Sequence, residues 1–156
     1  SQMWAYKGRS ERLRLLVSRT GAIRIEEAAL PEAVPHAVVP LAALPIDADD
    51  PLLFHKTTCR DPYLRAVKQR PGATDVLLFN RRGEITESTI ANVLVSIAGV
   101  LCTPPLRCGL LPGTARAALL RRGAVRERVM TCDELRRSPA VFLVNSVRGQ
   151  WPVRVG

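Results

Sequence analysis

Apolar and charged residues alternate with a period of two near the start of the sequence. Residues 12–18 read RLRLLVS and residues 22–27 read AIRIEE, with Thr20 and Gly21 between them. Strict alternation is typical of a strand that buries one face, and a threonine-glycine pair between two such runs favours a tight turn. The pattern therefore predicts a β-hairpin with one face exposed to water.

The next segment is interrupted by proline. The segment from Leu30 to Pro51 contains five prolines, Pro51 included, which excludes a helix and confines any strand, such as one over 37–44, to a sheet edge or a short pairing. An apolar run over 52–54 then leads to Lys56. We expect this run to carry the lysine inward.

Apolar runs separated by turn residues fill most of the remaining chain. They predict an antiparallel meander of strands over 75–80, 84–88, 92–97 and 100–103. Further strands are expected over 125–130, 140–144 and 151–155. Strands therefore dominate.

Short helices are expected between these strands. Asp61 and Pro62 resemble a helix cap followed by a proline in the first turn, and they favour a helix over 63–69. Alanine and leucine favour a helix over 115–122. Thr131 and Glu134 have the spacing of a capping box. The predicted fold class is α+β, in one domain over residues 1–156.

Composition narrows the class of protein. The 156 residues are 47% apolar and 24% charged, which is typical of a globular domain with one core. No apolar run reaches the ~18 residues of a membrane span, and no signal-peptide core is present, so we expect a cytoplasmic protein. Four cysteines without a C-x-x-C pair, with two histidines, favour reduced thiols and no metal site.

The net charge of +9 favours anionic partners. Nucleic acid is not expected, because the arginines are scattered and aromatic residues make up 4% of the chain, which leaves little to stack on bases. A phosphorylated cofactor or a carboxylated substrate suits a positive potential equally well. An arginine-rich solvated surface would also account for the charge.

Two side chains are candidates for chemistry. A lysine in a partly apolar pocket has a lowered pKa and becomes a nucleophile, so Lys56 could react, although a lysine at a strand end usually extends to water. Alternation places Glu87 on one strand face with Ile85 and Thr89. A carboxylate buried there needs a partner such as a protonated pyridine nitrogen; the alternative is an exposed glutamate.

Two further segments favour an anion. Residues 110–114 read LLPGT directly before a helix, where free backbone N–H groups and the helix dipole attract negative charge. Asn145 and Ser146 follow a predicted buried strand, and the hydroxyl could bind the same anion. Both segments are also compatible with ordinary turns and helix starts.

Taken in order, these segments resemble one family. FHKTT at 54–58, GEITESTIAN at 83–92, CGLLPG at 108–113 and FLVNSVRG at 142–149 are similar to motifs of the class IV aminotransferases, which are fold type IV pyridoxal 5′-phosphate enzymes. Within that family the chain is most similar to the aminodeoxychorismate lyase domain of para-aminobenzoate synthase fusions. The resemblance implies the large C-terminal domain of the D-amino-acid aminotransferase-like fold.

The resemblance also implies roles for individual residues. Lys56 would bond to the cofactor and later move protons, and Glu87 would face the pyridine nitrogen. Arg60 and Tyr63 would lie beside the lysine, and Arg148 would meet a substrate carboxylate. Phosphate contacts would come from Thr89, Ile90, Thr114, Ala115 and Ser146. At Ala115, where branched-chain relatives carry a hydroxyl, only the main chain could contribute.

The implied activity is release of pyruvate from a carboxylated amine to give para-aminobenzoate, in folate synthesis, by a homodimer. Family members also carry a small N-terminal domain that closes over the cofactor; this sequence begins after it by its motifs, and a chorismate-converting domain is sometimes fused upstream. The alternatives are a branched-chain or D-amino-acid transaminase, a non-catalytic dimerisation domain of the same fold, and a basic nucleic-acid module.

Overall fold

The computed structural model describes residues 11–30 and 36–156. The chain divides into two compact units, Ser1–Ala33 and Val34–Gly156, and each is described by itself. Predictions for residues 31–35 of the proline-rich segment lie outside the described residues.

The first unit contains the predicted hairpin. Strands β1 (Glu11–Val17) and β2 (Ile23–Ala29) pair in antiparallel register, with Leu15 opposite Ile25. Gly21 takes a positive φ of 84° in the turn. The expectation of a single exposed face is wrong. The apolar face is also exposed, because a two-stranded hairpin has no second layer of its own. The solvent-exposed fraction is 60–64% for each of its residues, Leu13, Leu15, Val17, Ile23 and Ile25.

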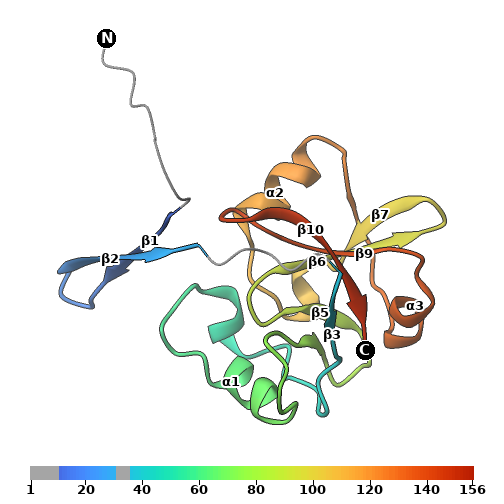
Figure 1. Cartoon of the computed structure of the whole chain (residues 1–156), viewed down its shortest axis with the longest axis horizontal. Coiled ribbons are helices and arrows are strands. Elements are labelled where there is room, and N and C mark those ends of the chain that lie inside the picture. Colours follow the sequence, from blue (N-terminus) through green and yellow to red (C-terminus); the bar gives the residue numbers. More distant parts are fainter. Residues whose placement is uncertain (1–10, 31–35) are drawn as a thin grey trace. The chain divides into compact units, whose positions relative to one another are not determined.

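The second unit is built on a branched sheet (Figure 1). Its strand order in the described residues is β3-β10-β9-β6-β5-β4, and β7 and β8 branch from β6. The strands are β3 (Ala37–Val39), β4 (Leu77–Phe79), β5 (Ile85–Ser88), β6 (Asn92–Ile97), β7 (Val100–Thr103), β8 (Arg126–Glu127), β9 (Val141–Asn145) and β10 (Gly149–Val155). The predicted α+β class is confirmed.

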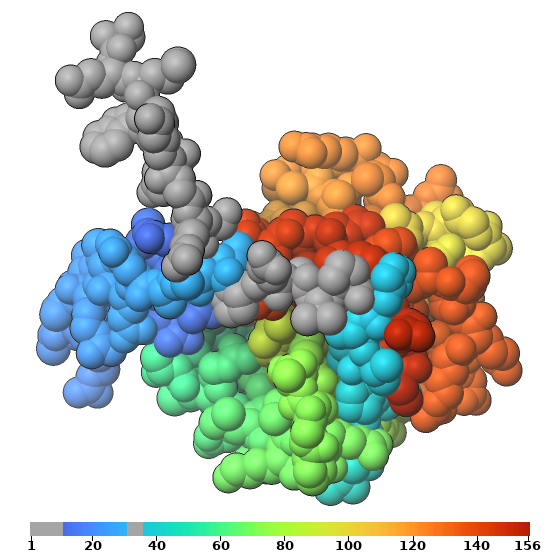
Figure 2. Space-filling view, in the orientation of Figure 1, coloured from blue at the N-terminus to red at the C-terminus, as the bar shows by residue number. Residues whose placement is uncertain are grey.

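The meander of β4 to β7 is antiparallel, as predicted. β3 lies at the sheet edge, as expected for a strand in a proline-rich segment, and pairs in parallel with β10. Figure 2 shows the cyan β3 segment directly beside the dark red end of β10.

The strand expected over 125–130 is mostly wrong. Only the two residues of β8 pair with β7. The Arg128 N–H still donates to the Thr103 carbonyl, but the Met130 carbonyl accepts from Ile85 N–H on β5. The segment therefore crosses from one strand to another, and no single ladder can extend along it.

Five short helices connect the strands in the described residues. They are η1 (Pro51–Phe54), α1 (Asp61–Lys68), η2 (Leu106–Cys108), α2 (Thr114–Arg121) and α3 (Cys132–Arg137). The capping box of Thr131 and Glu134 is present. Asp61, in contrast, does not cap α1: it is the first helical residue, and Arg60 at the cap makes no side-chain cap bond. None of these helices has the length and apolar character needed to cross a membrane.

Strand β6 is buried on both faces and organises the core. Val93 and Val95 pack with residues of α3, β9 and β10, whereas Leu94 packs with residues of α2. A further cluster joins η1 and α1 to the strand β4, around Leu53 and Leu78. The sheet therefore holds α1 and α2 at fixed positions beside the ends of β5 and β9.

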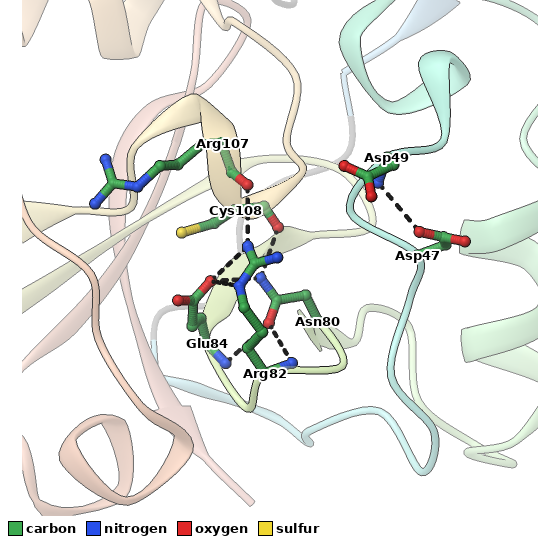
Figure 3. A network of polar contacts seen from close by, with 7 residues as sticks. All are labelled: Asp47, Asp49, Asn80, Arg82, Glu84, Arg107 and Cys108. Carbon is green, nitrogen blue, oxygen red and sulfur yellow. Dashed lines mark hydrogen bonds and ion pairs between the residues drawn. The ribbon is translucent and has the colours of Figure 1, made fainter.

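A polar network fixes the loop that leads to α2 (Figure 3). The Asn80 amide donates to Glu84 at 2.7 Å and to the Cys108 carbonyl at 3.1 Å. Arg82 donates to Glu84 and to the Arg107 carbonyl. The chain then turns at Gly109, which has a φ of 91°. A Cβ at Gly109 would lie 2.7 Å from the Ala48 Cα.

We predict that Gly109→Ala destabilises the protein more than Gly123→Ala does. Both glycines have a positive φ, but a Cβ at Gly123 would meet open space. The left-handed backbone costs each alanine roughly 1–2 kcal/mol, and the clash with Ala48 adds about 1–3 kcal/mol at Gly109 alone. Denaturant unfolding of the two variants measures the difference. Equal losses would show that the loop shifts freely to accept the methyl group.

Candidate active site

A cavity of about 340 Å³ opens at the ends of β5 and β9, beside α1 and the start of α2. Its size is typical of a small-molecule site. Four segments line it: 54–63, 87–92, 111–115 and 144–146. Nine of the ten candidate residues from the sequence contribute to this lining: Lys56, Arg60, Tyr63, Glu87, Thr89, Ile90, Thr114, Ala115 and Ser146.

Glu87 lies buried in the cavity at 4% exposure, which is the first of the two alternatives that the sequence left open. Its Oε1 accepts hydrogen bonds from the Tyr63 hydroxyl at 2.7 Å and from Leu111 N–H at 3.1 Å. Its Oε2 accepts one from the Asn92 amide at 3.1 Å. Three donors from three different elements therefore hold this carboxyl group in one orientation.

Burial raises the pKa of Glu87 to about 8, although the hydrogen bonds from Tyr63 and Leu111 and the charges of Arg60 and Lys56 act in the opposite direction. Burial, followed by the nearby carboxyl of Glu87, also raises the pKa of Tyr63. Near neutral pH the site therefore favours a proton on Glu87. A cationic group that entered the cavity would stabilise the carboxylate instead.

Lys56 lines the cavity but is exposed, so the expectation that the apolar run carries it inward is wrong for this chain. Leu53 takes the buried position in η1, and the backbone is already extended at His55. The lysine therefore lies at the rim. Its charge still acts on the Glu87 carboxyl.

Arg60 and Tyr63 lie next to each other at the start of α1. The Arg60 guanidinium lies 4.6 Å from the centre of the Tyr63 ring, a cation–π arrangement. It also donates a hydrogen bond to the Thr89 carbonyl. One positive charge is therefore fixed between α1 and the turn that follows β5.

The Thr89 hydroxyl is hydrogen-bonded within the protein. It donates to Asp75 Oδ1 at 2.6 Å, and Thr89 N–H donates to the same oxygen at 2.9 Å. Ile90 is 45% exposed, and its N–H makes a longer contact of 3.3 Å with the Ser88 hydroxyl. The Thr89 hydroxyl proton is therefore already used within the protein, whereas the Ile90 N–H makes only this longer contact.

Helix α2 points its first turn at the cavity. No side chain caps this helix, and the first N–H groups of a helix have no partner within it, so the N–H groups of Thr114 and Ala115 are placed to bind an anion. Gly113 packs so closely that a Cβ would lie 2.1 Å from Asn92 Oδ1. The buried Arg116 holds the helix by donating to the Pro104 carbonyl at 2.7 Å and to Glu127.

The turn after β9 separates two of the candidate residues. Asn145 Oδ1 accepts from the N–H groups of Val147 and Arg148, and Ser146 between them lines the cavity. Arg148 does not line it. Its guanidinium lies over the Trp151 ring, 5.8 Å from the centre.

Sequence reasoning missed three partners of the site: Asn92, the N–H of Leu111, and Asp75. Asn92 lies opposite Glu87 across the β5–β6 turn, so the short turn itself was a usable signal. Asp75 is a charged residue directly before a fully buried run, a position that demands a polar partner. No local pattern marks Leu111.

Comparisons with known proteins agree on one family. The family model described as Amino-transferase class IV matches residues 2–155. A Schizosaccharomyces pombe protein provisionally named as an aminodeoxychorismate lyase is 38% identical over 106 residues, which cover 64% of this chain and 46% of that protein. The aminodeoxychorismate lyase of Saccharomyces cerevisiae is 28% identical, with 88% of this chain and 50% of that protein covered. The chain thus spans about half the length of these relatives.

A solved structure from Mesorhizobium loti, provisionally named as an amino-acid aminotransferase, has the same fold. It superposes with a TM-score of 0.84 at 38% identity, and the match covers 94% of this chain and 73% of that one.

We predict that Glu87→Gln changes how stability depends on pH. Below pH 4.5, the ordinary value, the carboxyl is protonated in both states; between 4.5 and about 8, unfolding releases its proton, so rising pH favours the unfolded state. The free energy of unfolding of Glu87→Gln minus that of the wild type should therefore rise over this range, by on the order of a few kcal/mol.

Denaturant unfolding of the cofactor-free chain at several pH values measures this difference. Glu134→Gln is the control, since the Thr131 N–H and Arg128 lower the pKa of that carboxyl, so its difference from the wild type should be flat above pH about 5. A flat difference for Glu87→Gln would contradict the prediction.

Proposed function

The chain belongs to the class IV aminotransferase family, and from that premise we propose that it is the cofactor-binding domain of an aminodeoxychorismate lyase. The cofactor is pyridoxal 5′-phosphate, and the reaction releases pyruvate to leave para-aminobenzoate, a folate precursor. The proposal includes a homodimer in the cytoplasm. One observation supports it most directly. The buried carboxyl of Glu87, which accepts three hydrogen bonds, lines the same cavity as Lys56.

The residues present fit pyridoxal 5′-phosphate. Glu87 is a buried acid whose raised pKa favours a partner that carries or shares a proton, as a pyridine nitrogen does. The uncapped first turn of α2 provides N–H donors for a phosphate. Lys56 provides a primary amine on the lining of the same cavity.

When bound, the cofactor supplies an electron sink for a carbanion. Glu87 keeps the ring nitrogen protonated, which makes that sink effective. The Lys56 amine would hold the cofactor and, once free, would take the proton from the amine-bearing carbon of the substrate as the general base. Loss of pyruvate from the neighbouring carbon makes the product ring aromatic, so the reaction needs no oxidant.

The other residues of the cavity bind and orient. The N–H groups of Thr114 and Ala115, the main chain of Ile90 and the Ser146 hydroxyl surround the phosphate end. Thr89 contributes through its position in the same turn. Arg60 adds positive charge for an anionic group. We assign Arg148 to a substrate carboxylate only if its side chain leaves the Trp151 ring, since it does not line the cavity in this structure.

A transaminase is the second candidate. It would use Lys56 and Glu87 in the same roles but return an amino group from a second substrate. The amino-acid aminotransferase name of the Mesorhizobium loti structure, at 38% identity, favours this alternative.

We predict that Lys56→Ala abolishes the near-visible absorption band of the lysine-bound cofactor. Of the two lysines in the described residues, Lys56 and Lys68, Lys56 alone lines the cavity. Lys68→Ala is the matched control, since Lys68 is an exposed lysine on α1. The band should persist in that variant. An unchanged spectrum in Lys56→Ala would refute the role of Lys56.

We predict pyruvate release from aminodeoxychorismate, without transfer of the amino group to an added keto acid. Coupled detection of pyruvate and chromatography of amino acids measure the two outcomes in one reaction of the full-length protein. Amine transfer without pyruvate would favour the transaminase. Failure to bind pyridoxal 5′-phosphate at micromolar concentration would favour a non-catalytic domain.

A further inference from the structure

Asp75 is a buried carboxyl group that does not line the cavity. It is 5% exposed and directly precedes the buried segment that contains β4. Its Oδ1 accepts three hydrogen bonds, from Val76 N–H at 2.8 Å, Thr89 N–H at 2.9 Å and the Thr89 hydroxyl at 2.6 Å. Its Oδ2 is buried and has no partner among the described residues.

This arrangement lowers the stability of the folded state. A buried oxygen without a hydrogen bond destabilises the folded state, and burial raises the pKa of Asp75 despite its bonds to Thr89 and Val76. An apolar residue before β4 would avoid that cost. Two of the three hydrogen bonds to Oδ1, in contrast, come from one residue of the cavity, Thr89.

We propose that Asp75 is a positioning residue: it fixes Thr89 and, through the Thr89 carbonyl, sets the position of the Arg60 guanidinium in the cavity. The inference deepens the proposed function and rests on it, because the ligand whose binding Arg60 favours is the phosphorylated cofactor or its carboxylated substrate.

The contacts from Asp75 to the cavity form one series. Asp75 holds the N–H and the hydroxyl of Thr89. The carbonyl of the same residue accepts from Arg60, and the Arg60 guanidinium lies on the Tyr63 ring. The Tyr63 hydroxyl then donates to Glu87. A displaced Thr89 would therefore release Arg60 first, since no other hydrogen bond of its guanidinium to a described residue is present.

The test uses three single variants of the full chain with pyridoxal 5′-phosphate as the probe. Asp75→Ala removes the acceptor, and Asp75→Asn keeps an oxygen at the Oδ1 position. Leu135→Ala is the control, because Leu135 is fully buried among core residues of α3 and the sheet, away from the cavity lining, so it lowers stability without touching the site.

We predict that Asp75→Ala weakens binding of the probe by about tenfold, because the Thr89 hydroxyl loses its partner and the Thr89 N–H keeps only the Val76 carbonyl. Asp75→Asn should bind within about threefold of the wild type, since an amide oxygen accepts the same bonds. Leu135→Ala should bind like the wild type at a temperature where both are folded. Equal binding by Asp75→Ala and Leu135→Ala would overturn the proposal.

A double-mutant cycle tests whether Asp75 acts through Arg60. In an Arg60→Ala background, Asp75→Ala should cause no further loss, because the group it positions is absent. Additive losses would overturn the proposal. Where Asp75→Ala does not fold, Thr89→Val removes one of the Asp75 donors and keeps the side-chain shape; it should weaken binding less, and that loss should also vanish in the Arg60→Ala background.

Borohydride reduction followed by mass spectrometry separates this proposal from the proposed function. If reduction fixes the probe to Lys56 in the wild type but Asp75→Ala binds like the control, only the Asp75 proposal fails. If the wild type binds no probe, both fail.

Discussion

The buried carboxyl of Glu87 is the constraint on which the second unit depends. A carboxyl in an apolar setting is costly unless donors surround it, and here the donors come from α1, β6 and the loop before α2. Each of these elements reaches Glu87 only if the sheet places it correctly. The hydrogen bonds of Glu87 therefore form together only when α1, β6 and the loop before α2 are all in their folded positions.

The turn between β5 and β6 carries out most of this assembly. Glu87 and Asn92 flank it as a cross-strand pair, and the Asn92 amide donates both to Glu87 and to the Leu111 carbonyl. Thr89, inside the turn, links Asp75 to Arg60. The close approach of Gly113 to Asn92 brings the start of α2 to the same place. One short turn thus sets the positions of both Glu87 and the N-terminus of α2 at the cavity.

Features that depend on neighbouring residues were predicted from the sequence. The apolar run over 92–97 predicted β6 with its observed bounds, and the capping box predicted the start of α3. The length of β8 depends on which distant strands the segment pairs with. The exposure of Lys56 depends on which parts of the chain cover the edge of the cavity. Neither property can be predicted from a short stretch of sequence. The same holds within the site: the family resemblance grouped nine of its residues, but no local pattern marks the N–H of Leu111, which reaches Glu87 only in the folded chain.

Glu87 and Lys56 are held in opposite ways, and the difference suits the roles proposed for them. In the proposed function Glu87 would keep one orientation toward the cofactor ring, and three hydrogen bonds remove its freedom. Lys56 would first hold the cofactor and then reach a proton of the substrate, which a rigidly bound side chain could not do. It lies exposed at the rim, without a hydrogen bond to any described residue. Ordering a side chain costs rotamer entropy. The structure therefore orders the side chain of Glu87, for which the proposed reaction needs a constant geometry, and leaves that of Lys56 free to move.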